Sequence, residues 1–508
     1  MINISDTDFL CERKQKLMEN TKVKLNFNAY RDRVRACWIG KNIGGTMGGP
    51  YEGSRETFDI QGFSTPPGKP LPNDDLDLQL VWLHAVETRG ITELNADVLG
   101  AYWMDLIVPN WNEYGLSKSN MRRGLLPPLS GEYDSSWKES NGAWIRTEIW
   151  ACLAPGCPDI AAKYAIEDAK VDHGTGEGTM AAAFVAAMQS AAFAMPDIRT
   201  CIELAVEAIP AESRMADSIR FVLECYDKGM HPIDARNAVQ QRNADIGDGW
   251  FEAPSNVAYA AIGLLWGEGD FKKALITAIN CGDDADCTGA TVGATMGIFL
   301  GMKGVPEEYC AYIGDEIITI SLNKTCGSTG LRFPKTCSEL CERVIAEVPH
   351  TLHALRAPVS FTDGESDTPA EVRELLLEKC RETRKTATLK PFTVHYESTV
   401  LCADVTLSKK PEIAPGEEIE LSLEIYTRRT YGDIISALSF RWWLPEGFTA
   451  GGKQTATIPN RNTHEDGIAR ATLTLRAGDK VSAYNRCVLE IVAEARPDPL
   501  YVPITLLG

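Results

Sequence analysis

Residues 282–298 read Gly-Asp-Asp-Ala-Asp-Cys-Thr-Gly-Ala-Thr-Val-Gly-Ala-Thr-Met-Gly-Ile, an acidic cluster followed by small and apolar residues. The small and apolar part predicts a buried helix that begins at the acids. Gly289, Gly293 and Gly297 recur every four residues and therefore lie on one face of that helix. Because a glycine stripe has no side chains to hold a neighbour away, we expect a second helix to pack closely against it.

A second acidic cluster lies far earlier in the chain, where residues 73–77 read Asn-Asp-Asp-Leu-Asp. Residues 78–86 are mostly apolar and predict a buried helix, so the acids occupy its first turn, where the macrodipole favours anions. Asp74 and Asp77 are expected to share one face of this helix. Carboxylates gathered at the starts of buried helices repel one another and lose water unless a cation lies between them. We therefore predict that the two clusters are halves of one metal site.

The chemistry of these ligands restricts the metal. Oxygen donors suit hard cations, so Mg²⁺ is expected as one or two ions, with Mn²⁺ or Ca²⁺ as alternatives. Zinc would require His and Cys ligands at short fixed spacing, which the sequence lacks. Asp and Asn are also favoured helix caps, and capping is the preferred interpretation of either cluster alone. Two clusters before two apolar helices favour the metal site, and Asp77 and Asp283 add carboxylates nearby.

Three motifs, in this order, resemble those of the ADP-ribosylglycohydrolases. Residues 40–52, Gly-Lys-Asn-Ile-Gly-Gly-Thr-Met-Gly-Gly-Pro-Tyr-Glu, are similar to the family's opening motif, a glycine-rich helix and turn that end in a glutamate at the mouth of the site. Residues 73–76 fall on the family's Thr-Asp-Asp-Thr, and residues 284–287 fall on its Asp-Thr-Asp-Thr. The resemblance spans roughly residues 31–350, and three ordered motifs are far more specific than one glycine pattern.

The resemblance implies a metal-dependent hydrolase and assigns residues to its site. It implies Glu52, Asp75 and Asp284 as catalytic residues, with Glu52 at the substrate entrance, and Gly48 as a substrate-binding residue. Because Glu52 follows Pro50 in a turn, a merely solvated side chain is the alternative. The implied metal ligands are Asn73, Asp74, Asp75, Asp284, Asp286 and Cys287.

Several positions depart from the family's motifs. Gly45 stands where the family has an aspartate, Asn73 and Leu76 replace the threonines of the first acidic motif, and Ala285 and Cys287 replace those of the second. The amide oxygen of Asn73 still suits a hard cation, but a thiol is a poor ligand for Mg²⁺, so Thr288 or a water is expected to take its place. The departures point to one metal instead of two, to Mn²⁺ or Ca²⁺ in place of Mg²⁺, or to a substrate other than ADP-ribose.

Segments between the acidic motifs, which also resemble a bacterial branch of the family, contain further candidates. Arg146 is a candidate clamp for a phosphate or carboxylate, and an ion pair with Glu148 or another surface acid is the alternative. His173 lies four residues before Glu177, and both are candidates for substrate binding. A helix cap or a satisfied structural group is the alternative for His173.

Composition limits the class of protein. The chain has 508 residues, 44% of them hydrophobic, which is enough for a large core and at least two domains. A net charge of -19 disfavours nucleic-acid binding, because phosphate contacts need clustered Lys and Arg. No uninterrupted apolar segment is long enough to span a bilayer. Fifteen scattered cysteines, and a start at residues 1–8 without a basic or apolar run, predict reduced thiols and a cytoplasmic protein.

Sequence periodicity changes near residue 390. Upstream, Ala-rich helical patterns predict an all-α domain over residues 1–390. Downstream, the alternation of residues 418–425 and similar runs between Pro and Gly turns predict an immunoglobulin-like β-sandwich over residues 391–508. Trp442 and Trp443 are adjacent on a predicted strand and must point to opposite faces, so one of them is expected in the core.

Together these inferences predict a metal-dependent hydrolase that cleaves a glycosidic bond at an anomeric carbon, in a small-molecule or protein-linked glycoside. One alternative is a glycosidase or nucleosidase for a sugar other than ADP-ribose, which the lost threonines and the appended sandwich favour. Another is a catalytically silent binding protein on the same fold, which Gly45 and Cys287 favour. A homo-oligomer is allowed by the sequence.

Overall fold

The computed structural model describes residues 22–508 except 324–330, 367–369, 429–435, 460–466, 495 and 497. The chain divides into two compact units. Of the described residues, the helical unit comprises those in 22–109, 137–169 and 176–388. The β unit comprises those in 110–136, 170–175 and 389–508.

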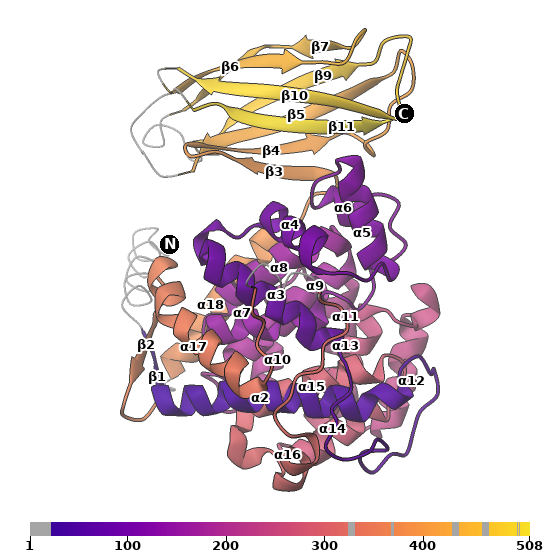
Figure 1. Cartoon of the computed structure of the whole chain (residues 1–508), viewed down its shortest axis with the longest axis vertical. Coiled ribbons are helices and arrows are strands. Elements are labelled where there is room, and N and C mark those ends of the chain that lie inside the picture. Colours follow the sequence, from indigo (N-terminus) through magenta and orange to yellow (C-terminus); the bar gives the residue numbers. More distant parts are fainter. Residues whose placement is uncertain are drawn as a thin grey trace, which may run out of the picture. The chain divides into compact units, whose positions relative to one another are not determined.

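Helices make up most of the helical unit (Figure 1). They are α2 (Phe27–Gly48), α3 (Asp74–Arg89), α4 (Ala96–Leu106), α7 (Glu148–Leu153), α8 (Pro158–His173, with its last turn in the β unit), α9 (Glu177–Ala192), α10 (Ile198–Val206), α11 (Arg214–Asp227), α12 (Pro232–Arg242), α13 (Ala253–Trp266), α14 (Phe271–Ile279), α15 (Ala285–Leu300), α16 (Glu307–Ile313), α17 (Cys337–Ala354) and α18 (Ala370–Ala387). The predicted helical domain is therefore confirmed.

One feature of this unit was not predicted. Strands β1 (Val23–Asn26) and β2 (Val359–Thr362) pair in parallel and form a two-stranded sheet. Each strand has only four residues, which is too short for an alternating pattern to stand out from the surrounding sequence.

The centre of the helical unit is formed by mostly apolar helices that are buried on every side. All residues of α9 after Glu177 are buried, as are all residues of α13 before Trp266 and those of α15 up to Ile298. A helix without a polar face can be stable only where neighbours cover it completely. The acids at the start of α15 are therefore held in the interior.

Helices α2 and α15 are in direct backbone contact along the predicted glycine stripe (Figure 1). A Cβ added at Gly293 would lie 2.1 Å from Gly40 O, and one added at Gly44 would lie 2.0 Å from Gly289 O. From one contact to the next, the residue number increases along α2 and decreases along α15. The two helices therefore run antiparallel. The C-terminal end of α2 consequently meets the N-terminal end of α15, where a Cβ at Gly48 would lie 2.1 Å from Ala285 O.

Two antiparallel sheets form the β unit, and the predicted β-sandwich is confirmed (Figure 1). Its strands are β3 (Thr393–Glu397), β4 (Leu401–Leu407), β5 (Glu418–Thr427), β6 (Ser436–Trp443), β7 (Thr449–Gly452), β8 (Thr455–Ile458), β9 (Ala469–Arg476), β10 (Tyr484–Ala493) and β11 (Leu500–Leu507). One sheet has the order β11-β10-β6-β8 and the other β3-β4-β5-β9-β7. Helices α5 (Asn112–Arg123) and α6 (Leu129–Glu132) belong to the same unit.

Alternation along these strands buries one face of each sheet. In β5, Ile419, Leu421, Leu423 and Ile425 enter a shared core, while the residues between them face outward. The adjacent tryptophans obey the same rule, since Trp442 packs against the core and Trp443 is 64% exposed. The prediction that one tryptophan would be in the core and the other outside it is correct.

The glycine contact generates a test of stability. Gly44→Ala is expected to destabilise the helical unit, because the new methyl group meets the backbone of α15 and neither helix can move without opening the contact. Overpacking of a core costs about 1–3 kcal/mol, and a clash with backbone places this variant at the upper end. Urea unfolding monitored by circular dichroism measures the loss.

Gly62→Ala is the control, because, apart from the adjoining residues of the chain, no heavy atom of the described residues lies within 4 Å of a Cβ at that position. Similar losses for Gly44→Ala and Gly62→Ala would contradict a close backbone contact between α2 and α15.

Candidate active site

The first acidic cluster forms the start of α3. Asn73 is the N-cap, and its Oδ1 accepts a hydrogen bond of 2.7 Å from Asp75 N. Asp74 and Asp75 occupy the first turn, with Asp74 half-buried and Asp75 completely buried. The oxygen of Asn73 thus serves as a helix cap, and its role as a metal ligand stays a prediction.

The second acidic cluster forms the start of α15. Asp284 is the N-cap residue, and its Oδ2 accepts a hydrogen bond of 2.7 Å from Asn141 Nδ2. Trp144 Nε1 donates to Asn141 Oδ1, which orients the amide so that its NH₂ group points at Asp284. The other carboxylate oxygen, Asp284 Oδ1, and Asp286 Oδ1 are buried and have no hydrogen-bond partner among the described residues. Ionising a buried carboxyl group is costly when one of its oxygens has no hydrogen-bond donor. Both oxygens are therefore suited to bind a cation.

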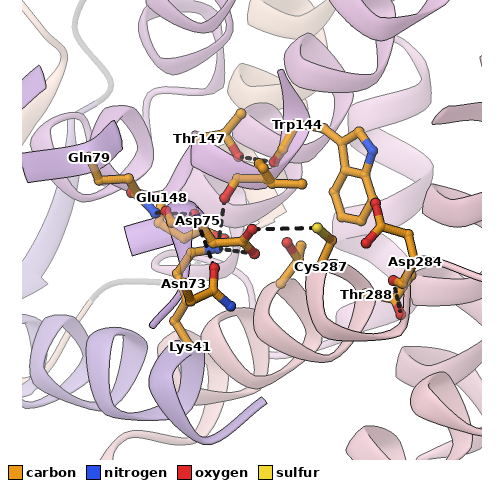
Figure 2. A network of polar contacts seen from close by, with 12 residues as sticks. Lys41, Asn73, Asp75, Gln79, Trp144, Thr147, Glu148, Asp284, Cys287 and Thr288 are labelled. Atoms are coloured by element: carbon orange, nitrogen blue, oxygen red, sulfur yellow. Dashed lines mark hydrogen bonds and ion pairs between the residues drawn. The ribbon is translucent and has the colours of Figure 1, made fainter. Parts of the chain in front are cut away.

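Glu52 completes the cluster from a third segment. It follows the 3₁₀-helix η1 (Gly49–Tyr51) directly after α2, and the antiparallel contact of α2 and α15 carries it to the acids of α15. Ligand atoms of Glu52, Asp284 and Asp286 lie within 4.8 Å of one another. Those of Asp75, Asp286 and Cys287 form a second group of the same size, so Asp286 belongs to both. The two acidic motifs predicted to meet are therefore close together (Figure 2).

Burial and mutual repulsion make these carboxyls weak acids. Burial, with the charges of Glu52 and Asp75, raises the pKa of Asp284 to about 8. Burial also holds the pKa values of Asp75 and Asp286 well above their usual range, although Lys41 opposes this for Asp75. The pKa of Glu52 is raised by burial and by Asp74. A divalent cation would displace the protons that the cluster otherwise retains.

Sequence reasoning missed the cation beside this cluster. Lys41 lies in α2 and is fully buried, with its Nζ 3.1 Å from Glu148 Oε2 and 3.5 Å from Asp75 Oδ2. Its Nζ also donates a hydrogen bond of 2.7 Å to Ile145 O. The available signal was a lone lysine among glycines and apolar residues in 36–48, because a buried ammonium requires an acidic partner.

Gly45 and Asn73, two positions that depart from the family's motifs, are neighbours in the structure, and a third such position, Cys287, contacts Asp75. A Cβ at Gly45 would lie 2.2 Å from Asn73 Nδ2, so the missing side chain at 45 makes room for the amide at 73. Cys287 Sγ donates to Asp75 Oδ1 over 3.4 Å. Burial and the surrounding carboxylates raise the pKa of the Cys287 thiol well above its usual range. The neutral thiol is thus a hydrogen-bond donor to Asp75.

Asp77 and Asp283, expected to add carboxylates to the site, accept hydrogen bonds from backbone and side-chain amides elsewhere. Asp77 Oδ2 accepts hydrogen bonds from Ile320 N and Ser321 N at 2.7 and 2.6 Å. Asp283 accepts from Phe251 N at 3.0 Å and from Asn256 Nδ2 at 3.0 Å. Each carboxylate anchors a distant loop, and the expected common face of Asp74 and Asp77 does not bring Asp77 into the cluster.

Arg146 forms a buried ion pair, but not with Glu148. Its Nε lies 3.0 Å from both carboxylate oxygens of Asp168, and the guanidinium stacks over the Trp103 ring at 4.9 Å. Another guanidinium nitrogen donates to Gly142 O. Arg146 and Asp168 are both buried, so an ion pair forms as the alternative expected, but with a buried acid instead of Glu148 or a surface acid. The role of phosphate clamp stays a prediction.

The remaining substrate-binding candidates have structural partners. Glu177 accepts hydrogen bonds from Arg214 N and Met215 N at 2.9 and 2.8 Å, and so places an anion at the start of α11. His173 belongs to the β unit, where its Nδ1 lies 2.9 Å from Asp172 Oδ1. Gly48 lies in the α2 and α15 contact. Their roles in substrate binding stay predictions.

Comparison with known proteins agrees with the resemblance. The family model described as ADP-ribosylglycohydrolase matches residues 27–337, which is more than half of the chain. No curated protein matches the chain. A solved structure titled "ADP-ribosylglycohydrolase-related protein complex" is 18% identical, with 63% of this chain and 99% of that chain covered and a TM-score of 0.41. A FixG-related protein from Vibrio parahaemolyticus is 12% identical, with coverages of 21% and 95% and a TM-score of 0.18.

The family match contains all three segments that supply the clustered carboxylates, namely the turn after α2 and the starts of α3 and α15. On the extent of this match, the chain belongs to the ADP-ribosylglycohydrolase family.

Proposed function

We propose that this protein is a metal-dependent hydrolase that cleaves a glycosidic bond at an anomeric carbon. The observation that carries the proposal is the pair of buried oxygens, Asp284 Oδ1 and Asp286 Oδ1, that find no donor in the described part of the chain. They lie beside Glu52, in segments that the match to the ADP-ribosylglycohydrolase family model covers. A purely structural cluster would be expected to satisfy such oxygens with its own N–H or O–H groups.

The donor set fits a hard divalent cation such as Mg²⁺, Mn²⁺ or Ca²⁺. Glu52, Asp284 and Asp286 would hold it through carboxylate oxygens, with Asp74 and Asp75 adjacent. When bound, the cation supplies positive charge that holds and polarises oxygen ligands, including water and sugar hydroxyls.

Glu52 is the group that we assign to proton transfer. It is the exposed member of its ligand group, whereas Asp284 and Asp286 are buried. Burial of the carboxyl and the charge of Asp74 raise its pKa above the ordinary value. A glutamate with a raised pKa is a stronger base toward an attacking water. Asp284 and Asp75 are held in place by Asn141 and Lys41 and would orient the reacting groups.

The substrate is a small-molecule or protein-linked glycoside. The family name supports ADP-ribose, while the altered Gly45, Asn73 and Cys287 favour a different sugar as the alternative. We also propose a cytoplasmic location, which is supported by the thirteen cysteines of the described residues, all of them free thiols. None of the helices described is both long and apolar enough to cross a membrane. The net charge of -19 supports the absence of a nucleic-acid partner.

Metal binding is the first test. Chelator-treated protein is expected to bind Mg²⁺, Mn²⁺ or Ca²⁺, and the Asp284→Ala/Asp286→Ala variant is expected to lose this binding because it lacks the two donor-free oxygens. Isothermal titration calorimetry measures both. Glu212→Gln, which neutralises an exposed carboxylate outside the cluster, should bind as the wild type does. A wild-type protein that binds none of the three ions would favour the silent binding protein.

Proton transfer by Glu52 is tested by hydrolysis assays on ADP-ribosylated peptides and on a panel of nitrophenyl glycosides. Glu52→Gln is expected to lower kcat by about 10²–10⁴, the usual contribution of a general acid or base. Activity on simple glycosides alone would select the alternative substrate class. Unchanged turnover by Glu52→Gln would refute the assignment of Glu52.

Stability against pH offers an independent test of the buried carboxyls. The pKa of Asp284 is about 8 in the native state against an ordinary value of 3.8, so the native state retains this proton more strongly than the unfolded state. The resulting stabilisation is complete below pH 4 and is lost as the pH rises through about 8. In chelator, the melting temperature is therefore expected to fall between pH 5 and pH 8.5, as measured by scanning fluorimetry.

Asp284→Asn should flatten this fall, and saturating Mn²⁺ should raise the melting temperature more at pH 8 than at pH 5. A melting temperature that rises steadily with pH in chelator would show that Asp284 is ionised in the metal-free protein.

A further inference from the structure

The buried Lys41 divides the acidic cluster into two unlike halves. Lys41, Glu148 and Asp75 have fully buried side chains, so the charges of this trio act on one another without screening by water. One ammonium faces two carboxylates, at 3.1 Å from Glu148 Oε2 and 3.5 Å from Asp75 Oδ2. Lys41 is thus a permanent cation beside one of the two groups of candidate ligands.

Hydrogen bonds fix this cation in place. Glu148 Oε2 accepts from Gln79 Nε2 at 2.7 Å and Glu148 Oε1 accepts from Gln189 Nε2 at 3.0 Å. The carbonyl oxygen of Ile145 binds Lys41 Nζ from another side. A side chain with this many buried partners does not leave Asp75 when an ion enters the cluster.

Asp75 already has a donor on each carboxylate oxygen. Its Oδ2 faces Lys41, and its Oδ1 accepts from the Cys287 thiol at 3.4 Å. Figure 2 shows the Asp75 carboxylate between these two side chains. The other half of the cluster differs, because Asp284 Oδ1 and Asp286 Oδ1 have no donor within the described residues.

We propose that the Lys41 ammonium takes the place of one divalent cation, so that the centre binds a single ion at Glu52, Asp284 and Asp286 and none at Asp75 and Cys287. The inference rests on the proposed metal-dependent function and deepens it. An ion between Asp75, Asp286 and Cys287 would face the ammonium across Asp75 and be repelled by it. It would also have to replace the thiol hydrogen bond, and a protonated thiol is a poor ligand.

The stoichiometry of Mn²⁺ tests the proposal on the full-length chain. Chelator-treated wild type is titrated with Mn²⁺ alone by isothermal titration calorimetry and by electron paramagnetic resonance. We expect one Mn²⁺ per chain with the spectrum of an isolated ion. Lys41→Met/Glu148→Gln removes one positive and one negative charge and leaves the net charge of the trio unchanged. We expect this variant to bind a second Mn²⁺, with a spectrum broadened by coupling between two nearby ions.

Glu148→Gln alone is the matched control, because it keeps the ammonium beside Asp75 and should still bind one ion. An amide at 148 can be satisfied if the side-chain amide of Gln189 flips. Circular dichroism establishes that each variant folds. Lys41→Gln, whose amide can still donate to Ile145 O, replaces the double variant if that one does not fold, and the same second ion is expected.

Each outcome is decisive. Two coupled ions in the wild type would overturn the single-ion proposal and leave the metal-dependent function standing. One ion in both the wild type and the Lys41 variants would show that Lys41 does not set the stoichiometry, which also overturns it. Binding of no ion by the wild type would overturn the proposed function and this inference together.

Discussion

Backbone contact between α2 and α15 is the constraint on which the candidate site depends. Glycines at four-residue intervals on both helices remove the side chains that would otherwise separate them. Because the helices run antiparallel, the turn that carries Glu52 reaches the first turn of α15, where Asp284 and Asp286 begin a buried helix. A bulkier residue in the stripe would move Glu52 relative to these acids.

Charge is the second constraint on this part of the molecule. Asp75, Asp284 and Asp286, at the starts of α3 and α15, are held out of water, and burial is the largest cause of the upward shift in their pKa values. The fold provides these carboxylates with unequal numbers of hydrogen-bond donors and cations. Lys41 and the Cys287 thiol each face one carboxylate oxygen of Asp75, whereas Asn141 donates to only one oxygen of Asp284. Each carboxylate oxygen of Asp75 therefore has a partner, whereas Asp284 and Asp286 each keep one oxygen without a donor among the described residues.

The residues that differ from the family's motifs at positions 45, 73 and 287 therefore lie in contact with one another or with the acids of the motifs, and are not isolated substitutions. The space above Gly45 is filled by Asn73, and Cys287 contributes a hydrogen bond in place of a hydroxyl group. The aspartates of the two acidic motifs are kept, whereas Gly45 replaces an aspartate of the opening motif and the groups around the acids differ. The β unit has its own core, to which the inward residues of both sheets contribute, and none of these substitutions lies in it.

Much of the fold could be predicted from local patterns. Alternation along residues 418–425, the glycine spacing of α15 and the acids before two apolar helices are properties of neighbouring residues, and helix and strand geometry translate them directly into faces. The same reasoning predicted opposite faces for Trp442 and Trp443 and the meeting of the two acidic motifs.

Other features depend on which distant segments meet. The pairing of Lys41 with Glu148 and of Arg146 with Asp168, and the use of Asp77 by the backbone of Ile320 and Ser321, join elements far apart in the chain. A sequence period specifies which face of a helix is buried, but not which group lies opposite each buried charge. That choice follows from close packing, because a charge held out of water must find its partner among the groups that the completed fold brings within hydrogen-bond distance.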